Sequence, residues 1–420
     1  MLCRTLLAVA VALFARASPV INQGEGLRID LPHRRSFTHA NGTFDFNKAI
    51  IETARTFNKH RQNLINLKAN LGEEAFNEGA EIRDFAVLPL HLVKRQSEPL
   101  QANDAGQEWL GTVSIGSPTG QSALLDFDTG SSDLWVGKSS GCTGCSGKHT
   151  YNPSLSTQSV AVGTTFSTRY ADGSTVSGPV YRDVVNVGTV VATGQTFAAV
   201  TQMSSLFQND PIDGILGMAF QSLAQLHAVP FFQNLVQERV ISSSVFGFKL
   251  SATESSSLYL GGTDTTLYTG SLENHPITSS GYWQISGGSI AVNGRTVVSG
   301  FGTIIDSGTA IMYGPPSSVE AVYASIPGSR VYSATQGLYE FPCNSVPNVA
   351  FSWGGTSWSI SADNFNLGLV AAGSSFCLGA LAGVDMGLGT NVWLLGDSFM
   401  KNVYTAFDVG NKAVGFATLA

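Results

Sequence analysis

The chain has 420 residues, of which 43% are hydrophobic and only 13% are charged, and it contains 46 glycines. This composition is typical of a globular protein rich in turns and excludes a disordered chain, and the length allows two or three domains. The formal net charge is −7. With no basic patch in the sequence, we expect no nucleic-acid partner.

The first 17 residues, 1–17, have the pattern of a signal peptide. Arg4 precedes an apolar run over residues 6–15, and small residues follow at a suitable cleavage position. The run is too short to span a bilayer comfortably and no later stretch is long enough, so we expect no membrane anchor. The product is therefore predicted to be secreted and extracellular rather than vacuolar.

Residues 18–95 differ in composition from the rest of the chain. They hold 11 basic and 9 acidic residues and include a helix-like, charge-rich patch over residues 47–71. The segment ends at the dibasic pair Lys94-Arg95, so we interpret it as a propeptide and place the mature start near Gln96. The alternative interpretation is a small helical domain joined by a linker.

The charge of this segment suggests a role. It is +2, whereas residues 96–420 hold 10 basic and 21 acidic residues and carry −11. A basic segment can cover an acidic cleft until the carboxylates protonate. We therefore expect the propeptide to be an intramolecular inhibitor that is released in acid.

The remaining residues, 96–420, are predicted to be mostly β. Strand-like runs such as 109–115, 184–191 and 257–260 are separated by Gly, Ser, Asn and Asp. Only 231–238 and 317–323 favour helices.

One motif occurs twice in this region. An apolar run delivers Asp128 into a Thr-Gly-Ser turn, and a second run delivers Asp306 into Ser-Gly-Thr. An apolar pair followed by glycine begins at Ile215, 87 residues after the first aspartate, and at Leu394, 88 residues after the second. The nearly equal spacing indicates an internal repeat. A duplicated body would bring the two carboxylates together at a pseudo-two-fold axis.

With these motifs, the chain resembles the pepsin-like (family A1) aspartic proteases of the fungal secreted type over roughly residues 96–420. The ordered motifs are DTGSSDLW, RYADGS, DGILG, IIDSGT and LLGDSFMKNVYTAFD. The resemblance implies a bilobal double β-barrel with an active-site cleft between the lobes. Residues 96–275 would form the N-terminal lobe with Asp128 and a flap, and residues 276–420 the C-terminal lobe with Asp306. We expect a monomer.

The resemblance implies that Asp128 and Asp306 form a catalytic pair, for which aspartic proteases are the standard example. Two carboxyl groups within hydrogen-bond reach share one proton and titrate as a unit. One then takes a proton from a bound water while the other polarises the scissile carbonyl. No cofactor and no metal are expected. Ser131 and Thr309 would hydrogen-bond the outer carboxylate oxygens. Gly130, Gly308 and Thr309, in the turns around the pair, are also expected to contact the substrate.

A second part of the expected site is a flap around residues 166–180, where Asp-Gly predicts a two-residue hairpin turn. By resemblance, Tyr170 caps the S1 subsite and bonds toward Trp135, which supports the pair. Phe207 and Ile215 would line the apolar walls of this subsite.

The flap tip, Asp172, Gly173 and Ser174, is expected to contact the substrate. It resembles fungal members that accept lysine at P1, the residue before the scissile bond, because a carboxylate can pair with an ammonium. The alternative is that Asp172 is an ordinary turn residue. Ala171 replaces the glycine that is more usual in this motif.

Four cysteines remain once Cys3 leaves with the signal peptide, and four cysteines allow three pairings. Sequence proximity and the family pattern favour Cys142 with Cys145 and Cys343 with Cys377. A zinc or redox site at the first pair is the competing interpretation, but zinc needs two more ligands at matching spacing.

Two alternatives to a protease remain. A paired-carboxylate glycosidase would have no need of duplicated turns of this type. An inactive protein of the same fold would be expected to lack an aspartate, a glycine or the flap tyrosine, and all are present. We therefore predict an acid endopeptidase that cleaves peptide and protein substrates between bulky hydrophobic residues. The resemblance also implies that Lys59 of the propeptide lies on the catalytic pair.

Overall fold

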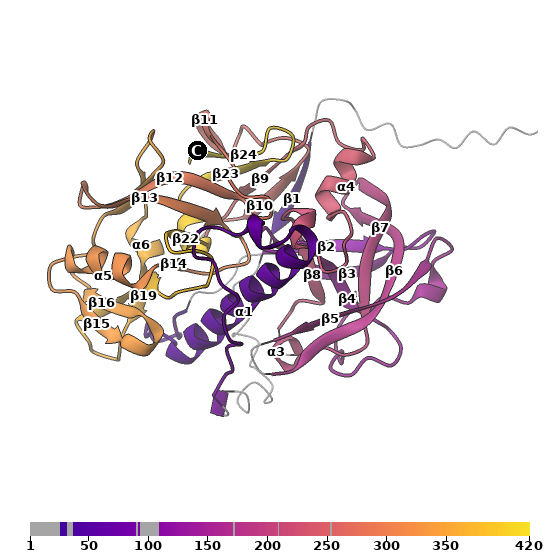
Figure 1. Ribbon diagram of the computed structural model, residues 1–420, viewed down its shortest axis with the longest axis horizontal. Helices are drawn as coiled ribbons and strands as arrows, with labels where there is room; N and C mark the ends of the chain where they lie inside the picture. Colours follow the sequence, from indigo (N-terminus) through magenta and orange to yellow (C-terminus); the bar gives the residue numbers. More distant parts are fainter. Residues whose placement is uncertain are drawn as a thin grey trace, which may run out of the picture.

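The computed structural model describes residues 26–31, 37–89, 91–92, 109–170, 173–208, 210–252 and 254–420. The predicted signal peptide, the Lys94-Arg95 pair and Asp172 lie outside these ranges. The described chain is dominated by strands arranged in two lobes, which confirms the predicted fold class (Figure 1). Within the described ranges, no helix combines the length and apolar character needed to cross a membrane.

The N-terminal lobe is built on a seven-stranded sheet. In spatial order its strands are β2 (Leu110–Ile115), β3 (Gln121–Asp128), β8 (Gly214–Gly217), β4 (Leu134–Gly137), β7 (Val190–Val200), β6 (Thr175–Val187) and β5 (Val160–Arg169). Strand β2 pairs with β6 as well as with β3, which closes six of these strands into a barrel. Alternate apolar side chains such as Phe127 and Phe197 fill its interior and are fully buried.

The C-terminal lobe contains a second seven-stranded sheet and a smaller four-stranded one. The first has the order β18 (Trp358–Ser359), β17 (Val349–Ser352), β12 (Gln284–Val292), β13 (Arg295–Ile305), β22 (Val392–Leu395), β14 (Met312–Gly314) and β21 (Leu381–Gly383). The second has the order β15 (Arg330–Ser333), β16 (Leu338–Pro342), β20 (Phe376–Gly379) and β19 (Asn366–Leu369).

A six-stranded sheet joins the lobes. Its order is β1 (Leu27–Leu31), β10 (Ser256–Leu260), β9 (Val245–Lys249), β23 (Tyr404–Asp408), β24 (Ala413–Leu419) and β11 (Tyr268–Pro276). Strands from both ends of the chain therefore meet in one sheet. Edge strand β1 comes from the predicted propeptide and pairs antiparallel with β10. The predicted division at residues 275 and 276 falls at the end of β11 and stays a prediction.

The internal repeat of the sequence corresponds to a repeated strand arrangement. Strand β3, which ends at Asp128, runs parallel to β8, and β13 runs parallel to β22 immediately before Asp306. In each lobe a third strand, β4 or β14, pairs antiparallel with the second. The strand residues nearest the two aspartates, 125–128 of β3 and 303–305 of β13, are buried, which explains the short apolar runs before each aspartate in the sequence.

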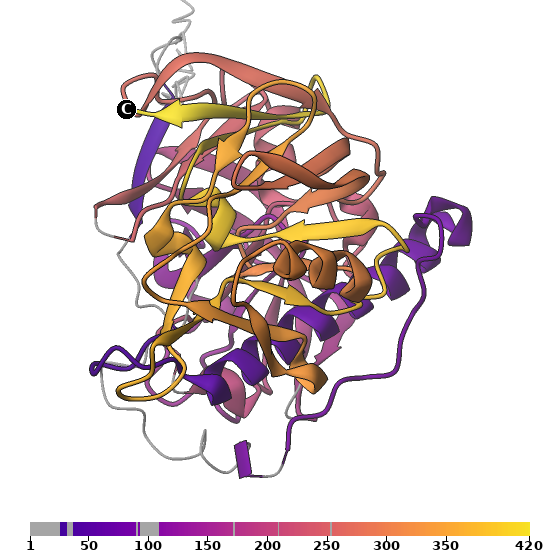
Figure 2. The same cartoon turned by 90° about the vertical axis from the view of Figure 1, so that its left-hand side faces the viewer.

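The longest helix, α1 (Phe46–Leu71), belongs to the predicted propeptide. The Asp45 side chain caps its first turn by accepting from the Lys48 amide, and Gly72 ends it with a positive φ of 90°. Both views show α1 crossing between the two lobes (Figures 1 and 2). The shorter helices are α3 (Ser205–Gln208), α4 (Phe231–Gln237), α5 (Pro316–Ala324), α6 (Ala362–Phe365) and α7 (Asp397–Met400), with 3₁₀ turns at Glu73–Ala75, Pro153–Leu155, Gln221–Leu223 and Ala334–Gln336.

Most of the predicted elements are present, with one clear error. The strand predicted over residues 184–191 is wrong, because β6 ends at Val187, β7 begins at Val190, and these two residues pair across a tight turn. Gly188 makes this turn possible with a positive φ of 55°. Valines on both sides of the turn hid it in the apolar pattern.

Two disulfides join the predicted partners, Cys142 with Cys145 and Cys343 with Cys377. The second pair is separated by 34 positions and ties β20 to the end of β16. Replacing Cys343 and Cys377 by alanine should lower the free energy of unfolding by about 3–4 kcal/mol, because a closed loop of this size restricts the unfolded chain. Denaturant unfolding measures the loss, and the Cys142/Cys145 double variant, with its short loop, should lose clearly less.

Candidate active site

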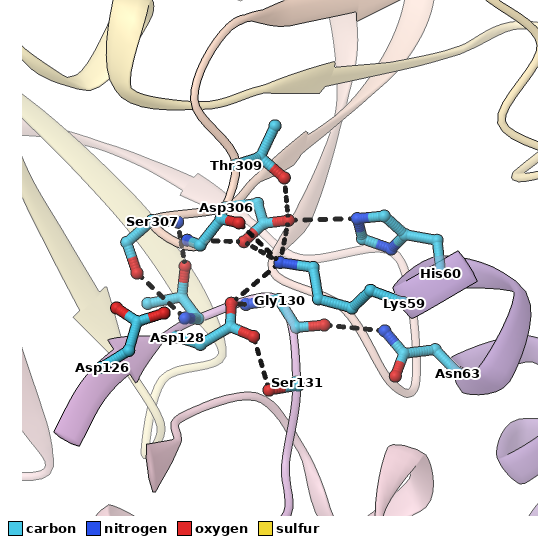
Figure 3. Close-up of polar contacts among 12 residues, drawn as sticks. Lys59, His60, Asn63, Asp126, Asp128, Gly130, Ser131, Asp306, Ser307 and Thr309 are labelled. Carbon is cyan, nitrogen blue, oxygen red and sulfur yellow. Dashed lines mark hydrogen bonds and ion pairs between the residues drawn. The ribbon is translucent and has the colours of Figure 1, made fainter. Parts of the chain in front are cut away.

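The two aspartates of the repeat, one from each lobe, lie close together beneath Lys59 of α1 (Figure 3). Asp128 is the last residue of β3, and Asp306 follows β13 directly. Their exposed fractions are 2% and 0%. One oxygen of each carboxylate lies 3.0 Å from the Lys59 ammonium nitrogen, so those two oxygens are no more than twice that distance apart.

Each carboxylate is held by its own turn in the same way. The Gly130 amide donates to Asp128 Oδ1 at 2.8 Å, and the Ser131 hydroxyl donates to Oδ2 at 2.5 Å. The Gly308 amide likewise donates to Asp306 Oδ1 at 2.9 Å, and a threonine hydroxyl, that of Thr309, donates to Oδ2 at 2.6 Å. The amide and hydroxyl hydrogen bonds leave little freedom of rotation to either carboxylate.

A reciprocal pair of hydrogen bonds joins the two turns. The Thr129 amide donates to the Ser307 hydroxyl at 3.0 Å, and the Ser307 amide donates to the Thr129 hydroxyl at 2.9 Å. The Thr129 hydroxyl in turn donates to the Ile305 carbonyl and the Ser307 hydroxyl to the Phe127 carbonyl. Each lobe thus binds the strand end of the other. Sequence analysis missed this role, although the hydroxyl residue after each aspartate was a usable signal.

The turns need glycine because each faces the carboxylate of the opposite lobe. A Cβ on Gly130 would lie 2.3 Å from Asp306 Oδ1, and one on Gly308 would lie 2.1 Å from Asp128 Oδ1. Both distances are well below van der Waals contact. The two glycines therefore allow the carboxylates to approach one another.

Replacing Gly308 by alanine should reduce kcat about 10²-fold, because it pushes the carboxylates apart by a fraction of an ångström or more. Steady-state kinetics on a peptide substrate measure this effect. Gly194→Ala is the matched control, since its Cβ would meet nothing closer than 3.8 Å. Equal kcat for the two variants would contradict the close approach inferred here.

Helix α1 covers the two aspartates. The Lys59 ammonium contacts both carboxylates and donates to the Gly308 carbonyl at 3.1 Å. The Asn63 amide, one turn further along, donates to the Gly130 carbonyl at 2.7 Å. The structure thus places Lys59 where the resemblance implied. The helix residues that line the same cavity as Asp128 include Glu52, Arg55, Thr56, Lys59 and Asn63.

His60 is a contact that sequence analysis did not predict. Its Nε2 lies 3.0 Å from Asp306 Oδ2, and its side chain is fully buried. The ring packs beside Tyr282, with the ring centroids 5.8 Å apart. The second aspartate therefore has two nitrogen partners from α1, whereas the first has Lys59 alone among the contacts described.

The two carboxylates differ in pKa. Burial raises the pKa of Asp128; the Lys59 ammonium opposes this, and the charge of Asp306 adds to it. Burial acts on Asp306 in the same direction, but the Lys59 ammonium and the His60 hydrogen bond outweigh it and hold the pKa of Asp306 below its usual value. Although burial disfavours a charged Lys59, the two carboxylates raise the pKa of its ammonium. With α1 in place, Asp306 is therefore the carboxyl group that ionises at the lower pH.

The predicted flap is the hairpin of β5 and β6. The Tyr170 amide donates to the Ser174 carbonyl at 2.9 Å, and the Gly173 amide donates back to the Tyr170 carbonyl at 2.7 Å. Three residues therefore separate the paired Tyr170 and Ser174, rather than the two of the predicted turn. Gly173 has a positive φ of 83°, as the last position of such a loop requires. Asp172, the tip residue expected to contact lysine, lies outside the described residues.

The predicted subsite residues lie together on the flap side of the cleft. The Tyr170 ring packs edge-on against Phe207 at 4.7 Å between centroids, and Phe207 packs against Trp135 at 5.3 Å. Ile215 pairs with Trp135 in the sheet. All four residues line the cavity that also contains Asp128. The expected bond from Tyr170 to Trp135 stays a prediction, since Phe207 contacts both rings.

Other buried carboxylates have structural partners. Asp126 accepts from the Trp109 amide, and Asp397 accepts from the indole nitrogen of the same tryptophan at 2.6 Å. Asp213 accepts from the Leu124 amide at 2.7 Å. These contacts hold loops and strand ends in place, although Asp126 also lines the cavity that contains Asp128.

Comparison with known proteins identifies the family of the chain. The family model for eukaryotic aspartyl proteases matches residues 108–419. An aspartic protease of Phaffia rhodozyma is 44% identical over 334 residues, which cover 77% of this chain and 80% of the relative. Pepsin A of Bos taurus is 32% identical over 372 residues, covering 86% and 96%, and cathepsin E of Aquarana catesbeiana is 34% identical over 354 residues, covering 81% and 85%. The chain therefore belongs to the eukaryotic aspartyl protease family of pepsin-like hydrolases, which act on peptide bonds.

Proposed function

We propose that Asp128 and Asp306 hydrolyse peptide bonds by activating a water molecule directly, without a covalent intermediate. The observation that carries this proposal is the pair of matching turns that hold two buried carboxylates face to face. The ionised carboxylate takes a proton from the water, whose oxygen adds to the scissile carbonyl carbon while the protonated carboxyl donates its proton to the carbonyl oxygen. A proton then passes to the leaving nitrogen, and the C–N bond breaks.

In this mechanism, Ser131 and Thr309 orient the carboxylates and Gly130 and Gly308 leave room between them. Their amide and hydroxyl donors lower the cost of a negative charge on a buried carboxylate. Once the Lys59 ammonium has left, the two carboxyl groups share one proton, because two adjacent buried charges repel each other strongly. With one proton between them, one carboxyl group is protonated and can act as the acid, and the other is ionised and can act as the base.

The proposed substrates are extended peptide segments with bulky hydrophobic residues on both sides of the scissile bond. The aromatic and aliphatic wall formed by Trp135, Phe207 and Ile215 supports this preference for the P1 side chain, because burial of a large apolar side chain contributes about 1.5–3 kcal/mol. Tyr170 would close over this wall with the flap. The acceptance of lysine at P1 through Asp172 stays a prediction.

We also propose that residues 18–95 are an inhibitory propeptide and that the enzyme is secreted and acts in acid. The position of α1 over the two aspartates supports this proposal, since no peptide substrate can reach them while Lys59 and Asn63 occupy the cleft. Removal would follow when carboxylates protonate and the ion pairs weaken. A vacuolar location is the alternative for localisation.

The test is digestion of haemoglobin or casein by the full chain after exposure to acid. We expect cleavage that a statine-type inhibitor blocks, together with loss of residues 18–95 detected by N-terminal sequencing. Loss of this segment without any digestion would contradict the proposal and favour an inactive binding protein of the same fold. Rapid self-catalysed loss at neutral pH and none in acid would contradict activation by acid.

A further inference from the structure

A charged contact lies at the flap side of the cleft, one helical turn before the lysine that lies on the aspartates. Arg55 of α1 donates to the Leu206 carbonyl at 2.7 Å and lies 3.6 Å from the Asp210 carboxylate. Its guanidinium also stacks over the Phe207 ring, 5.4 Å from the centroid. A carbonyl, a carboxylate and an aromatic face thus surround one guanidinium, which is the combination that recognises arginine in proteins.

These three partners belong to the enzyme and remain when α1 leaves. Asp210 follows α3, and its side chain is only 5% exposed with α1 in place. The Lys148 ammonium donates to the Asp210 and Ile212 carbonyls, so the loop that carries the carboxylate is anchored. Glu52, the other carboxylate on the Arg55 guanidinium, lies on α1 itself and departs with it. Departure of α1 therefore leaves an acidic residue beside an apolar wall, without the cation that neutralised it.

The position of this site relative to the reaction centre follows from helix geometry. Arg55 precedes Lys59 by four residues, which is about 6 Å along a helix axis. Two residues of an extended peptide cover about the same distance, and residues two apart point to the same face. Lys59 lies on the two aspartates, so a side chain held where Arg55 lies belongs to a residue about two positions from the scissile bond, on the side of Phe207. If Tyr170 caps the subsite for P1, this residue is P3.

We propose that Phe207, the Leu206 carbonyl and Asp210 form a subsite for a basic side chain, arginine above all, at P3 of the peptide substrate. The inference rests on the proposed function, since it assumes that peptides bind across Asp128 and Asp306. Arg55 occupies the place that the substrate side chain takes after α1 has left. Arginine fits better than lysine, because the planar guanidinium can stack on Phe207 and donate to two acceptors at once.

The experiment compares three peptides that differ only at P3, which carries arginine, citrulline or norleucine. All three keep phenylalanine at P1, so that the flap tip around Asp172 has no charge to contact. Citrulline has nearly the shape of arginine but no charge. The acid-activated enzyme should cleave the arginine peptide with a kcat/KM at least about tenfold above that of the citrulline peptide, measured at pH ~5, where carboxyl groups in general are ionised.

The variant Asp210→Asn should bring the ratio of the arginine to the citrulline kcat/KM close to one. Asp385→Asn is the matched control, because Asp385 also binds a propeptide arginine, Arg83, at 2.6 Å, but lies in the C-terminal lobe. Its ratio should equal that of the wild type.

Equal cleavage of the arginine and citrulline peptides by the wild type would overturn the inference and leave the proposed function standing. An unchanged ratio in Asp210→Asn would overturn it as well and would mean that Asp210 serves only to hold the propeptide. Failure to cleave any of the three peptides would contradict the proposed function itself. The comparison of peptides on the wild-type enzyme does not depend on the folding of any variant.

Discussion

Replacing Asp306 by asparagine is expected to lower kcat/KM for peptide hydrolysis at least about 10³-fold, and Asp128→Asn is expected to do the same. An amide cannot accept the proton of the attacking water, and it cannot share a proton with the opposite carboxylate. Because such variants should not process themselves, each is treated with a trace of tagged wild-type enzyme, which is then removed. Cleavage of a quenched fluorescent peptide measures the remaining rate.

The control is Asp408→Asn. Asp408 ends β23 and accepts hydrogen bonds from the Asn411 amide and side chain at 2.9 and 2.7 Å, so its carboxylate also organises a turn. It lies outside the candidate site, and its variant should keep its rate within about twofold. The substrate-binding surface is checked by the affinity of a statine-type inhibitor. An undiminished rate in either Asp128→Asn or Asp306→Asn would disprove the proposed mechanism.

The fold was predictable because the sequence contains the same physical pattern twice. Strands β3 and β13 are buried at the residues nearest the site, 125–128 and 303–305, where each sequence turns apolar before an aspartate that a hydroxyl residue and a glycine follow. The parallel neighbour β8 carries the first apolar pair and glycine of the repeat, and β22 carries the second apolar pair, with its glycine directly after the strand. Spacing alone therefore predicted two halves and the meeting of Asp128 and Asp306. It could not predict the cross-lobe bonds of Thr129 and Ser307, which depend on three-dimensional placement.

The sequence pattern of helix α1 does not predict which of its residues are buried. Its buried residues include Asn58, His60, Asn63 and Asn66, whereas an amphipathic helix normally buries an apolar stripe. The side-chain amides of these asparagines donate to main-chain carbonyls. Asn58 donates to Ala86, which follows α1 in the chain, and Asn66 donates to Leu223 of the N-terminal lobe. A charge-rich helical pattern predicts a solvated helix just as well. Only the placement of α1 in a polar cleft explains why these residues are buried.

Replacing Lys59 by glutamine should weaken the hold of α1 on the cleft by about 3 kcal/mol, or roughly 10²-fold, because it removes the cation from two buried carboxylates. The full chain should then bind a fluorescent statine-type inhibitor near neutral pH, where the wild type does not. It should also lose residues 18–95 at a higher pH than the wild type. Inhibitor binding by fluorescence anisotropy and gel analysis of the chain length measure the two effects.

The pH dependence of this release follows from the directions of the pKa shifts. The lowered pKa of Asp306 stabilises the α1-bound form above the ordinary aspartate pKa of about 3.9, and this contribution is lost as the pH falls toward the lowered value. The raised pKa of Lys59 contributes at every pH below its ordinary value of about 10.4, so it does not change in acid. The raised pKa of Asp128 acts in the opposite sense, since its contribution weakens as the pH rises above about 3.9. Asp306 is therefore the member of the pair whose protonation favours release in acid.

Lys59→Gln should consequently flatten the pH dependence as well as raise the pH of release, because the ammonium is the main charge that lowers the pKa of Asp306. Lys68→Gln is the matched control. Lys68 lies on the same helix, but it pairs with Glu73 of the proposed propeptide and is half exposed, so its loss should cost at most about 1 kcal/mol. If the wild type, Lys59→Gln and Lys68→Gln release residues 18–95 along the same pH curve, Lys59 is not what holds α1 over the aspartates. If the pH curve of Lys59→Gln is shifted but not flattened, Lys59 still holds α1 over the aspartates. The response to acid would then come from other ion pairs, such as Arg83 with Asp385.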